Sequence, residues 1–127
     1  MEPNEEFTRG LALRRQMFGE AGAEQQIASA TEFTQPLQEW VTRVCFGELW
    51  HRPGLDFRMR SIITIAMLAA LNRPNQVKIH VQGALENGVT VEEIREILLH
   101  AALYAGVPAA VESFVAASDV LAGASTK

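Results

Sequence analysis

The sequence predicts an all-α fold of about six helices. Apolar residues recur at the 3.6-residue spacing of a helix in most segments, and residues that start or stop helices stand at nearly every boundary. The Asn87–Gly88 pair ends a helical pattern and does not join two alternating strands. With 127 residues, the chain is predicted to form a single domain over 1–127, with frayed ends at 1–4 and 123–127.

The first part of the chain contains two predicted helices. One spans 5–18 and is followed by a stretch rich in Gly, Ala and Gln. The other spans about 35–47. Thr34 stands where its side chain can cap this helix, and Pro36 lies in the first turn, where a missing N–H does no harm.

The third predicted helix spans about 57–72 and follows a turn at Pro53–Gly54. Its second half, residues 62–71, is apolar on all sides. A helix without a polar face is typical of the protein interior, so we expect it to be central and buried on most sides. Met59 and Met67 are predicted to be core residues.

Three further helices complete the predicted fold. The fourth begins at Pro74 and ends at the Asn87–Gly88 pair. The fifth follows a capping box at Thr90–Glu93, in which side chains and backbone N–H groups satisfy each other, and it stops at Gly106. The sixth spans about 108–121.

Composition excludes several classes of function. The net charge is −4, and the longest run of basic residues is the pair Arg14–Arg15, so the basic surface of a nucleic-acid binder is missing. The longest uncharged apolar stretch, 61–71, is far shorter than the roughly 20 residues that cross a bilayer. Cys45 is the only cysteine, so no intrachain disulfide can form. We expect a cytoplasmic protein that binds neither nucleic acid nor membrane.

A set of short motifs extends over roughly residues 5–121. In chain order they are Arg9-Gly-Leu-Ala-Leu-Arg-Arg15, Phe46-Gly-Glu-Leu-Trp50, Arg52-Pro-Gly-Leu55, Arg58-Met-Arg-Ser61, His80-Val-Gln-Gly-Ala-Leu85, Asn87-Gly88, Thr90-Val-Glu-Glu-Ile94 and Tyr104-Ala-Gly-Val-Pro-Ala-Ala110. Together they resemble the γ-carboxymuconolactone decarboxylase pattern of the carboxymuconolactone decarboxylase family. The resemblance implies the helical fold of that family.

The same superfamily has peroxidase-like members with a Cys-x-x-Cys pair just ahead of the matching histidine. Those cysteines would fall at Arg73 and Gln76 in this sequence. Thiol–disulfide chemistry needs an attacking thiolate and a second thiol to resolve the mixed disulfide. Because Cys45 is the only thiol, the sequence excludes that branch.

The resemblance implies decarboxylation of γ-carboxymuconolactone to β-ketoadipate enol-lactone, in the β-ketoadipate (protocatechuate) pathway of aromatic catabolism. Loss of CO₂ drives electrons through the ring C=C bond into the lactone carbonyl, and the resulting dienolate is protonated on carbon. The substrate supplies its own electron sink, so no cofactor and no metal are expected. The sequence contains no His/Cys ligand cluster, phosphate loop or flavin fingerprint.

His80 is the first candidate for the catalytic proton transfer. It lies at the rim of the apolar stripe of the fourth helix, where a side chain can be partly buried and face a cavity. A histidine there can donate a proton near neutral pH. The alternative is a histidine at the edge of the core, hydrogen-bonded to a backbone carbonyl.

Glu48 is the second candidate. It follows a helix end among apolar residues such as Trp50, and a carboxyl in apolar company holds its proton more firmly. It could serve as the acid or orient His80. The alternatives are an exposed loop acid or an ion pair with Arg52 or Arg58.

Other residues are predicted to contact the substrate. Arg52, Arg58 and Arg60 cluster around the start of the third helix, and a guanidinium suits bidentate carboxylate binding. Arg60 is preferred because it adjoins the apolar run. Tyr104 could donate its hydroxyl to the developing oxyanion, and Trp50 could line the pocket. The alternatives are ion pairs at a surface or subunit interface for the arginines and simple packing for both aromatic residues.

The resemblance also implies a homo-oligomer, a trimer or hexamer in which a neighbouring subunit could complete the site. Two other functions stay open. One is a related enzyme that acts on another carboxylated lactone or keto-acid, because fold alone does not determine function. The other is a non-catalytic helical oligomer that binds a small acid. The joint presence of His80, Glu48 and the arginines argues against this last alternative.

Overall fold

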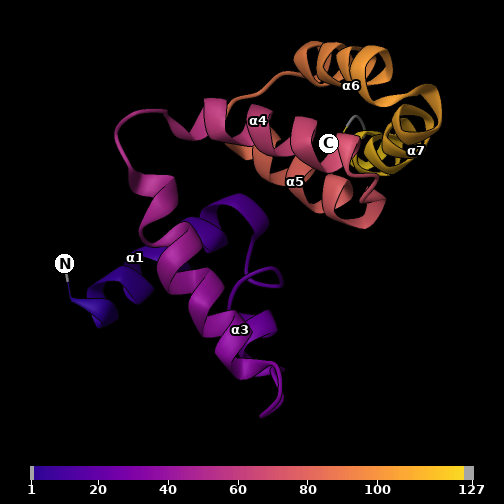
Figure 1. The fold of residues 1–127 in the computed structure, drawn as a ribbon. Coiled ribbons are helices and arrows are strands. Elements are labelled where there is room, and N and C mark those ends of the chain that lie inside the picture. Colours follow the sequence, from indigo (N-terminus) through magenta and orange to yellow (C-terminus); the bar gives the residue numbers. More distant parts are fainter. Residues whose placement is uncertain (1, 125–127) are drawn as a thin grey trace. The chain divides into compact units, whose positions relative to one another are not determined.

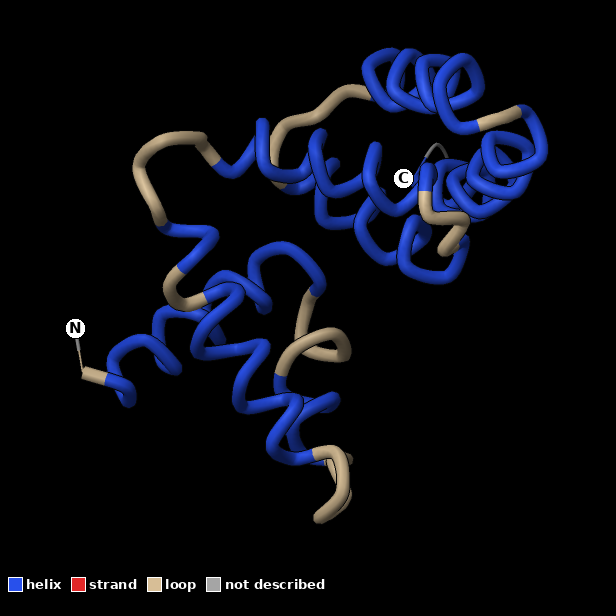
Figure 2. Tube along the Cα trace, in the orientation of Figure 1, coloured by secondary structure: helices blue, strands red, loops and turns tan. Residues whose placement is uncertain are grey.

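The computed structural model describes residues 2–124, and its regular elements are all helices, without a strand among these residues (Figures 1 and 2). The predicted all-α class is therefore confirmed. Contacts divide the chain into two compact units, Met1–Phe57 (unit 1) and Arg58–Lys127 (unit 2), and each is described by itself. The prediction of one domain over 1–127 stays a prediction.

Unit 1 is built from one helix of 16 residues and four shorter helical elements. They are α1 (Pro3–Phe18), α2 (Glu24–Ala28), α3 (Gln35–Trp40), the π-helical η1 (Val41–Phe46) and the 3₁₀-helical η2 (Leu49–His51). The predicted helix over 35–47 is thus α3 running directly into η1. Helix α2 was not predicted, because it has five residues and no buried side chain and so lacks an apolar pattern.

The cap expected at Thr34 is not formed. The Thr34 hydroxyl accepts a hydrogen bond from the Thr31 N–H at 2.8 Å. It accepts none from the backbone N–H groups in the first turn of α3. Thr34 has helical backbone angles and an N–H that donates to the Thr31 carbonyl at 3.1 Å, so it belongs to the preceding turn. A capping side chain normally requires extended backbone at its residue.

Two glycines let α1 and η1 approach closely. A Cβ atom on Gly10 would lie 1.8 Å from the Thr42 carbonyl oxygen, and one on Gly47 would lie 2.1 Å from the Glu6 carbonyl oxygen. No side chain fits at such distances, so glycine is required at both contacts. The core of unit 1 forms beside them, from the buried residues Leu13, Met17, Phe46 and Trp50.

Unit 2 contains four helices, visible as the pink to yellow part of Figure 1. They are α4 (Phe57–Ala70), α5 (Pro74–Glu86), α6 (Val91–Ala105) and α7 (Val107–Ala124). Buried aliphatic residues from all four helices form one core, represented by Ile65 of α4, Val81 of α5, Leu98 of α6 and Ala117 of α7. Burial of this shared apolar surface is what holds helices of this length in place.

The predicted helix start at α6 is confirmed. The Thr90 hydroxyl accepts from the Glu93 N–H at 3.1 Å, and the Glu93 carboxylate accepts from the Thr90 N–H at 3.0 Å, which completes the capping box. Gly88 closes the preceding helix with φ of 88°, a conformation that glycine adopts without strain. The third predicted helix ends at Ala70 and not at Asn72, which has φ of 55°.

The prediction that α4 is buried on most sides is wrong for the single chain. Its buried residues are Ser61, Ile65 and Ala69, which share one face. Met67 is 61% exposed, and Met59 is exposed as well, so neither is a core residue. Ile62 and Leu68 are partly buried against the core of unit 2, so α4 is fully buried along one face only.

The predicted frayed ends lie partly outside the described residues. Within residues 2–124, Pro3 and Asn4 already belong to α1, and Gly123 and Ala124 belong to α7. None of the helices described is long and apolar enough to cross a membrane.

Candidate active site

His80 lies on α5, where Val77, Val81 and Ala84 turn to the core and leave it at the rim of the buried stripe, as predicted. Its side chain is partly buried. This burial lowers the pKa of His80 from 6.5 to about 4, because an imidazolium loses hydration there. In the ligand-free chain the imidazole is therefore neutral at neutral pH, and the expectation that it donates a proton there needs a further charge nearby.

Glu48 lies between η1 and η2, and its backbone is hydrogen-bonded to both. Its N–H donates to the Val44 carbonyl, and its carbonyl accepts from the His51 N–H, each at 3.2 Å. The side chain is exposed, so the expected apolar surroundings of the carboxyl are absent in the single chain. Among residues 2–57 its carboxylate forms no ion pair with Arg52.

Arg9 fixes the residue that precedes Glu48. Its guanidinium donates from Nε to the Gly47 carbonyl at 2.8 Å, and its Nη2 donates to the same oxygen. The contact joins the Arg9-Gly10 motif of α1 to the Gly47-Glu48 motif after η1. No role was predicted for Arg9, because a contact across 38 positions leaves no local pattern in the sequence.

Trp50 is a buried residue of the unit 1 core. Its ring packs against Phe46, with centroids 5.6 Å apart at a tilt of 33°. Its side chain also makes a hydrogen bond with Cys45, and burial raises the pKa of that thiol. Packing therefore accounts for the position of Trp50, and its role as a pocket wall stays a prediction.

The three arginines have different surroundings. Arg58 forms an ion pair with Glu93, the same carboxylate that completes the capping box of α6. Arg52 ends η2 and is exposed. Arg60 is partly buried in the first turns of α4, and its carbonyl accepts from the Thr64 hydroxyl at 2.7 Å. Arg58 thus matches the ion-pairing alternative, and the role of Arg60 as the preferred substrate contact stays a prediction.

Tyr104 is 78% exposed on α6, so the alternative of a packed aromatic residue does not describe it. Its ring lies beside that of His100, with centroids 5.0 Å apart. The two rings lie at the edge of a pocket of about 660 Å³ between α4 and α6. The pocket is lined by Ile62, Ala66, Ala70, Glu96, Ile97, His100, Ala101, Tyr104 and Ala105.

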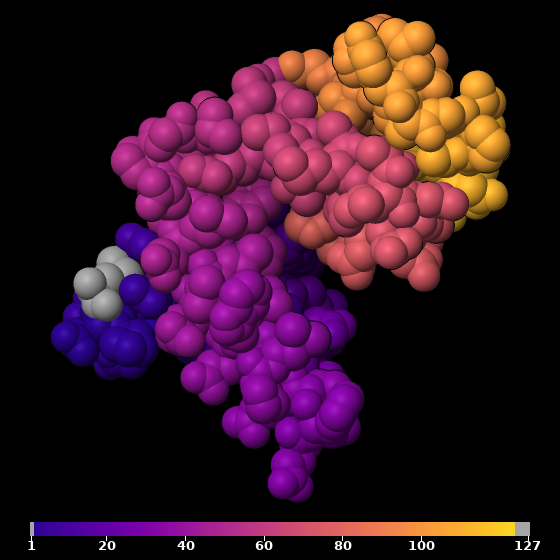
Figure 3. Space-filling view, in the orientation of Figure 1, coloured from indigo at the N-terminus to yellow at the C-terminus, as the bar shows by residue number. Residues whose placement is uncertain are grey.

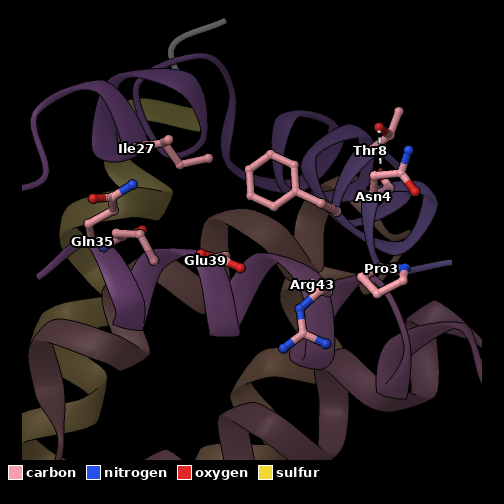
Figure 4. Close-up of a pocket in the computed structure, with 9 residues that line it drawn as sticks. Pro3, Asn4, Thr8, Ile27, Gln35, Glu39 and Arg43 are labelled. Carbon is pink, nitrogen blue, oxygen red and sulfur yellow. Dashed lines mark hydrogen bonds between the residues drawn. The ribbon is translucent and has the colours of Figure 1, made fainter.

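A second pocket, of about 500 Å³, lies in unit 1 and was not predicted (Figure 4). Gln35, Glu39 and Arg43 contribute to it from one face of α3 and η1, Ile27 from α2, and Asn4 from α1. The spacing i, i+4, i+8 was the sequence signal that could have revealed the polar wall. One guanidinium and several amides could hold a carboxylate there, although the carboxylates of Glu39 and Glu6 oppose it; Glu6 lies 3.8 Å from the Arg43 guanidinium.

Ser61 and Asn87 form a further hydrogen bond, which was not predicted from the sequence. The Asn87 amide donates to the Ser61 hydroxyl at 3.0 Å, and Ser61 is buried. The bond joins the end of α5 to α4. Ser61 lies on α4 within one turn of Arg58 and Arg60. Both residues lie in quoted motifs, but the pairing crosses 26 positions.

The predicted site residues are divided between the two units. Unit 1 contains Glu48, Trp50 and Arg52, and unit 2 contains Arg58, Arg60, His80 and Tyr104. Over the part of the chain that the structure describes, no three His, Cys, Asp or Glu side chains are grouped to hold a metal ion.

A helical chain with a partly buried neutral imidazole and several guanidinium groups has the residues of an acid–base enzyme for small carboxylates. The sequence pattern of the carboxymuconolactone decarboxylase family matches residues 35–119. The chain belongs to this family.

Two curated relatives are similar over most of their length. The 4-carboxymuconolactone decarboxylase of Acinetobacter baylyi is 36% identical over 120 residues, which cover 94% of this chain and 90% of the relative. The nitrosuccinic acid decarboxylase npaB of Metarhizium robertsii is 38% identical over 109 residues, covering 86% of this chain and 76% of the relative. Both relatives are decarboxylases, and the chain is accordingly a carboxy-lyase.

Proposed function

We propose that this enzyme decarboxylates γ-carboxymuconolactone to β-ketoadipate enol-lactone, as a cytoplasmic step of the β-ketoadipate pathway. The observation that carries the proposal is the 36% identity to a 4-carboxymuconolactone decarboxylase along 94% of this chain. A likeness of this extent includes residues of both units. No cofactor is required by the proposed chemistry.

The reaction makes three demands on the protein. The C–C bond to the departing carboxylate breaks, and its electron pair moves through the ring C=C bond into the lactone carbonyl oxygen. The resulting dienolate then takes one proton on carbon, and CO₂ leaves. The protein must hold a dianion, stabilise the oxyanion and supply the proton. It should not grip the departing carboxylate, because only contacts that are stronger in the transition state accelerate the reaction.

His80 is suited to the proton transfer once the substrate is bound. Its pKa of about 4 leaves it neutral in the free enzyme. A carboxylate within about 4–6 Å favours the charged form of a histidine, so the dianionic substrate raises the pKa of the imidazole. The imidazolium formed in this way is an acid next to the carbon that must be protonated. Substrate binding and proton supply are then coupled.

The remaining predicted residues take the supporting roles. Arg60 binds the carboxylate that stays on the product, while Arg58 keeps its ion pair with Glu93. Tyr104 donates its hydroxyl to the lactone oxyanion. Glu48 is the second candidate for the acid, and its exposure in the single chain gives this role less support than the burial of His80 gives to the first.

A different substrate is the alternative, and the second relative favours it. Nitrosuccinic acid is a dicarboxylic acid whose nitro group can accept the electron pair that decarboxylation releases, as the lactone carbonyl does in γ-carboxymuconolactone. The 38% identity to a nitrosuccinic acid decarboxylase is similar to the identity to the first relative. A carboxylated substrate with its own electron sink is common to both.

A turnover assay with both compounds tests the proposal. Purified enzyme is mixed with γ-carboxymuconolactone or with nitrosuccinic acid, and CO₂ release is followed with and without a chelator. We expect turnover of the lactone in both conditions. Turnover of nitrosuccinic acid but not of the lactone would contradict the proposed substrate and the proposed pathway. Activity that the chelator abolishes would contradict the cofactor-free mechanism.

A further inference from the structure

The pocket of unit 1 carries charges of both signs. Its lining includes the Arg43 guanidinium, from η1, and the Glu39 carboxylate, from α3. None of the residues predicted to act in catalysis or substrate binding lines it. Gln35 and Glu39 are exposed, and the purple part of Figure 3, which includes α3, lies at the surface, so a solute can enter from water. Its volume of about 500 Å³ is within the range of small-ligand pockets.

Glu39 and Arg43 do not neutralise each other. They are four positions apart, the spacing at which an acid and a base pair on an α-helix. The Arg43 guanidinium instead lies 3.8 Å from the Glu6 carboxylate, and Glu39 has no ion-pair partner among residues 2–57. The helix becomes π-helical at Val41, and this wider turn moves Arg43 out of line with Glu39. The pocket therefore keeps an unpaired carboxylate near a guanidinium.

Gln38 adds a hydrogen-bond donor to the pocket lining. Its side-chain oxygen accepts from the Arg14 guanidinium at 3.0 Å, which leaves the Gln38 NH₂ group to donate to a ligand. Arg14 is buried and has no carboxylate partner among residues 2–57, so its positive charge polarises the amide that it binds. A carboxylate between Gln38 and Arg43 would contact one guanidinium directly and lie one amide away from a second.

The rest of the pocket wall is partly apolar. Phe7 of α1 and Ile27 of α2 are both half-buried and line it. In Figure 4, Ile27 and Thr8 lie on opposite sides of the pocket, with Glu39 between them. A ligand that matches this lining has a carboxylate, an ammonium group and an apolar body. A dicarboxylate does not match it, because Glu39 would repel the second negative charge.

We infer that this pocket binds a free α-amino acid with an apolar side chain. Arg43 and the Gln38 amide bind its carboxylate, Glu39 binds its ammonium group, and its side chain contacts Phe7 and Ile27. The two charged groups of an α-amino acid are attached to one carbon, so they suit an acid and a base on neighbouring turns of one helix. The inference does not depend on the proposed substrate, because none of the residues proposed for the reaction takes part.

Isothermal titration calorimetry of the full chain tests the site, with L-phenylalanine as the probe. We expect a Kd of about 1 mM or below. Two analogues each lack one charge: 3-phenylpropionate has no ammonium group, and 2-phenylethylamine has no carboxylate. Each should bind about tenfold more weakly or worse, the usual loss for one charge-assisted hydrogen bond.

Two results with the wild-type chain would overturn the inference. One is the absence of L-phenylalanine binding at about 10 mM, well above the expected Kd. The other is 3-phenylpropionate binding as tightly as L-phenylalanine, which would make the pocket a simple anion site and leave Glu39 without a role.

Two variants with matched controls test the location of the site. Glu39→Gln and Arg43→Gln should each weaken L-phenylalanine binding about tenfold or more, because each removes one charged contact. Glu32→Gln and Arg15→Gln change exposed residues of unit 1 outside the pocket and should leave the Kd unchanged. Equal affinities of Glu39→Gln and Glu32→Gln would show that the amino acid does not bind here. Circular dichroism identifies any variant that fails to fold, and Glu39 is exposed, so its substitution should be tolerated.

Discussion

The guanidinium of Arg14 donates a hydrogen bond of 2.8 Å to the hydroxyl of Thr42, inside unit 1. Arg14 is only 6% exposed, and its other acceptors are the Gln38 side chain at 3.0 Å and the Gly22 carbonyl at 3.2 Å. None of the carboxylates in residues 2–124 is paired with it. Burial among neutral groups lowers the pKa of Arg14, and the three bonds join α1 to the following turn and to α3–η1.

Removing the Arg14 guanidinium should destabilise the protein strongly. Arg14→Met keeps much of the side-chain volume but leaves three acceptors without their donor. We expect a loss of about 2–4 kcal/mol in the free energy of unfolding, measured by urea denaturation. Arg15→Met is the control, because Arg15 is exposed and solvent screens its ion pair with Glu24. Equal losses of unfolding free energy in the two variants would show that the three hydrogen bonds of Arg14 do not stabilise unit 1.

Gly10→Ala should also destabilise unit 1, through a steric conflict. The added Cβ would lie 1.8 Å from the Thr42 carbonyl oxygen, so α1 and η1 must move apart. We expect a loss of about 1–3 kcal/mol, the usual cost of forcing extra atoms into a packed contact. Gly54→Ala is the matched control, since a Cβ added at Gly54 would have no neighbouring atom within 4 Å. A Gly10→Ala protein as stable as this control would show that the contact can relax.

His80 should make the protein less stable in mild acid. Its folded-state pKa, about 4, lies below the ordinary value of 6.5, so between these pH values the unfolded chain binds a proton that the folded chain does not. Stability therefore falls as pH drops below about 6.5, and the loss, roughly 3–4 kcal/mol, is complete below about pH 4. Urea denaturation across this window should show a steeper pH dependence for wild type than for His80→Gln. Parallel curves would mean that His80 titrates normally.

Loss of the His80 imidazole should slow turnover without abolishing folding. We expect His80→Gln to lower kcat by about 10²–10⁴-fold, the range for a general acid. In wild type, the pKa that governs kcat should lie above the value of about 4 for free His80, because the bound dianion favours the imidazolium. Glu48→Gln is the comparison. A larger loss of kcat in Glu48→Gln than in His80→Gln would assign the proton transfer to Glu48.

Arg60 and Arg58 should differ in their effect on substrate binding. Arg60→Met should raise KM about tenfold or more, since a charge-assisted contact to a carboxylate is worth about 1.5–3 kcal/mol. Arg58→Met should leave KM nearly unchanged and lower stability by at most about 1 kcal/mol, because its ion pair with Glu93 is partly exposed. Steady-state kinetics and urea denaturation of both variants separate these effects. The reverse order of KM changes would make Arg58 the substrate contact.

Local patterns in the sequence predicted most of the helices. The Thr90–Glu93 capping box and the Gly88 stop were predicted correctly because cap and helix lie within one turn of each other. Thr34 was predicted wrongly as a cap, because its hydroxyl accepts from the Thr31 N–H. The residue type alone does not reveal which backbone N–H a hydroxyl will bind. The position of His80 at the rim of α5 followed from periodicity, but the size of its pKa shift followed only from burial.

The sequence by itself determined the helical class, the helix boundaries to within a few residues and the family, because capping, periodicity and short motifs are encoded over a few neighbouring positions. Only the tertiary structure decided the contacts between distant positions. Arg14 meets Thr42 across 28 positions, and Asn87 meets Ser61 across 26. The exposure of Met67 on α4 is the same kind of result, because the apolar residues of a helix cannot specify which other helices will cover them. Such pairings depend on which buried polar groups find partners and which surfaces pack together once the helices have formed.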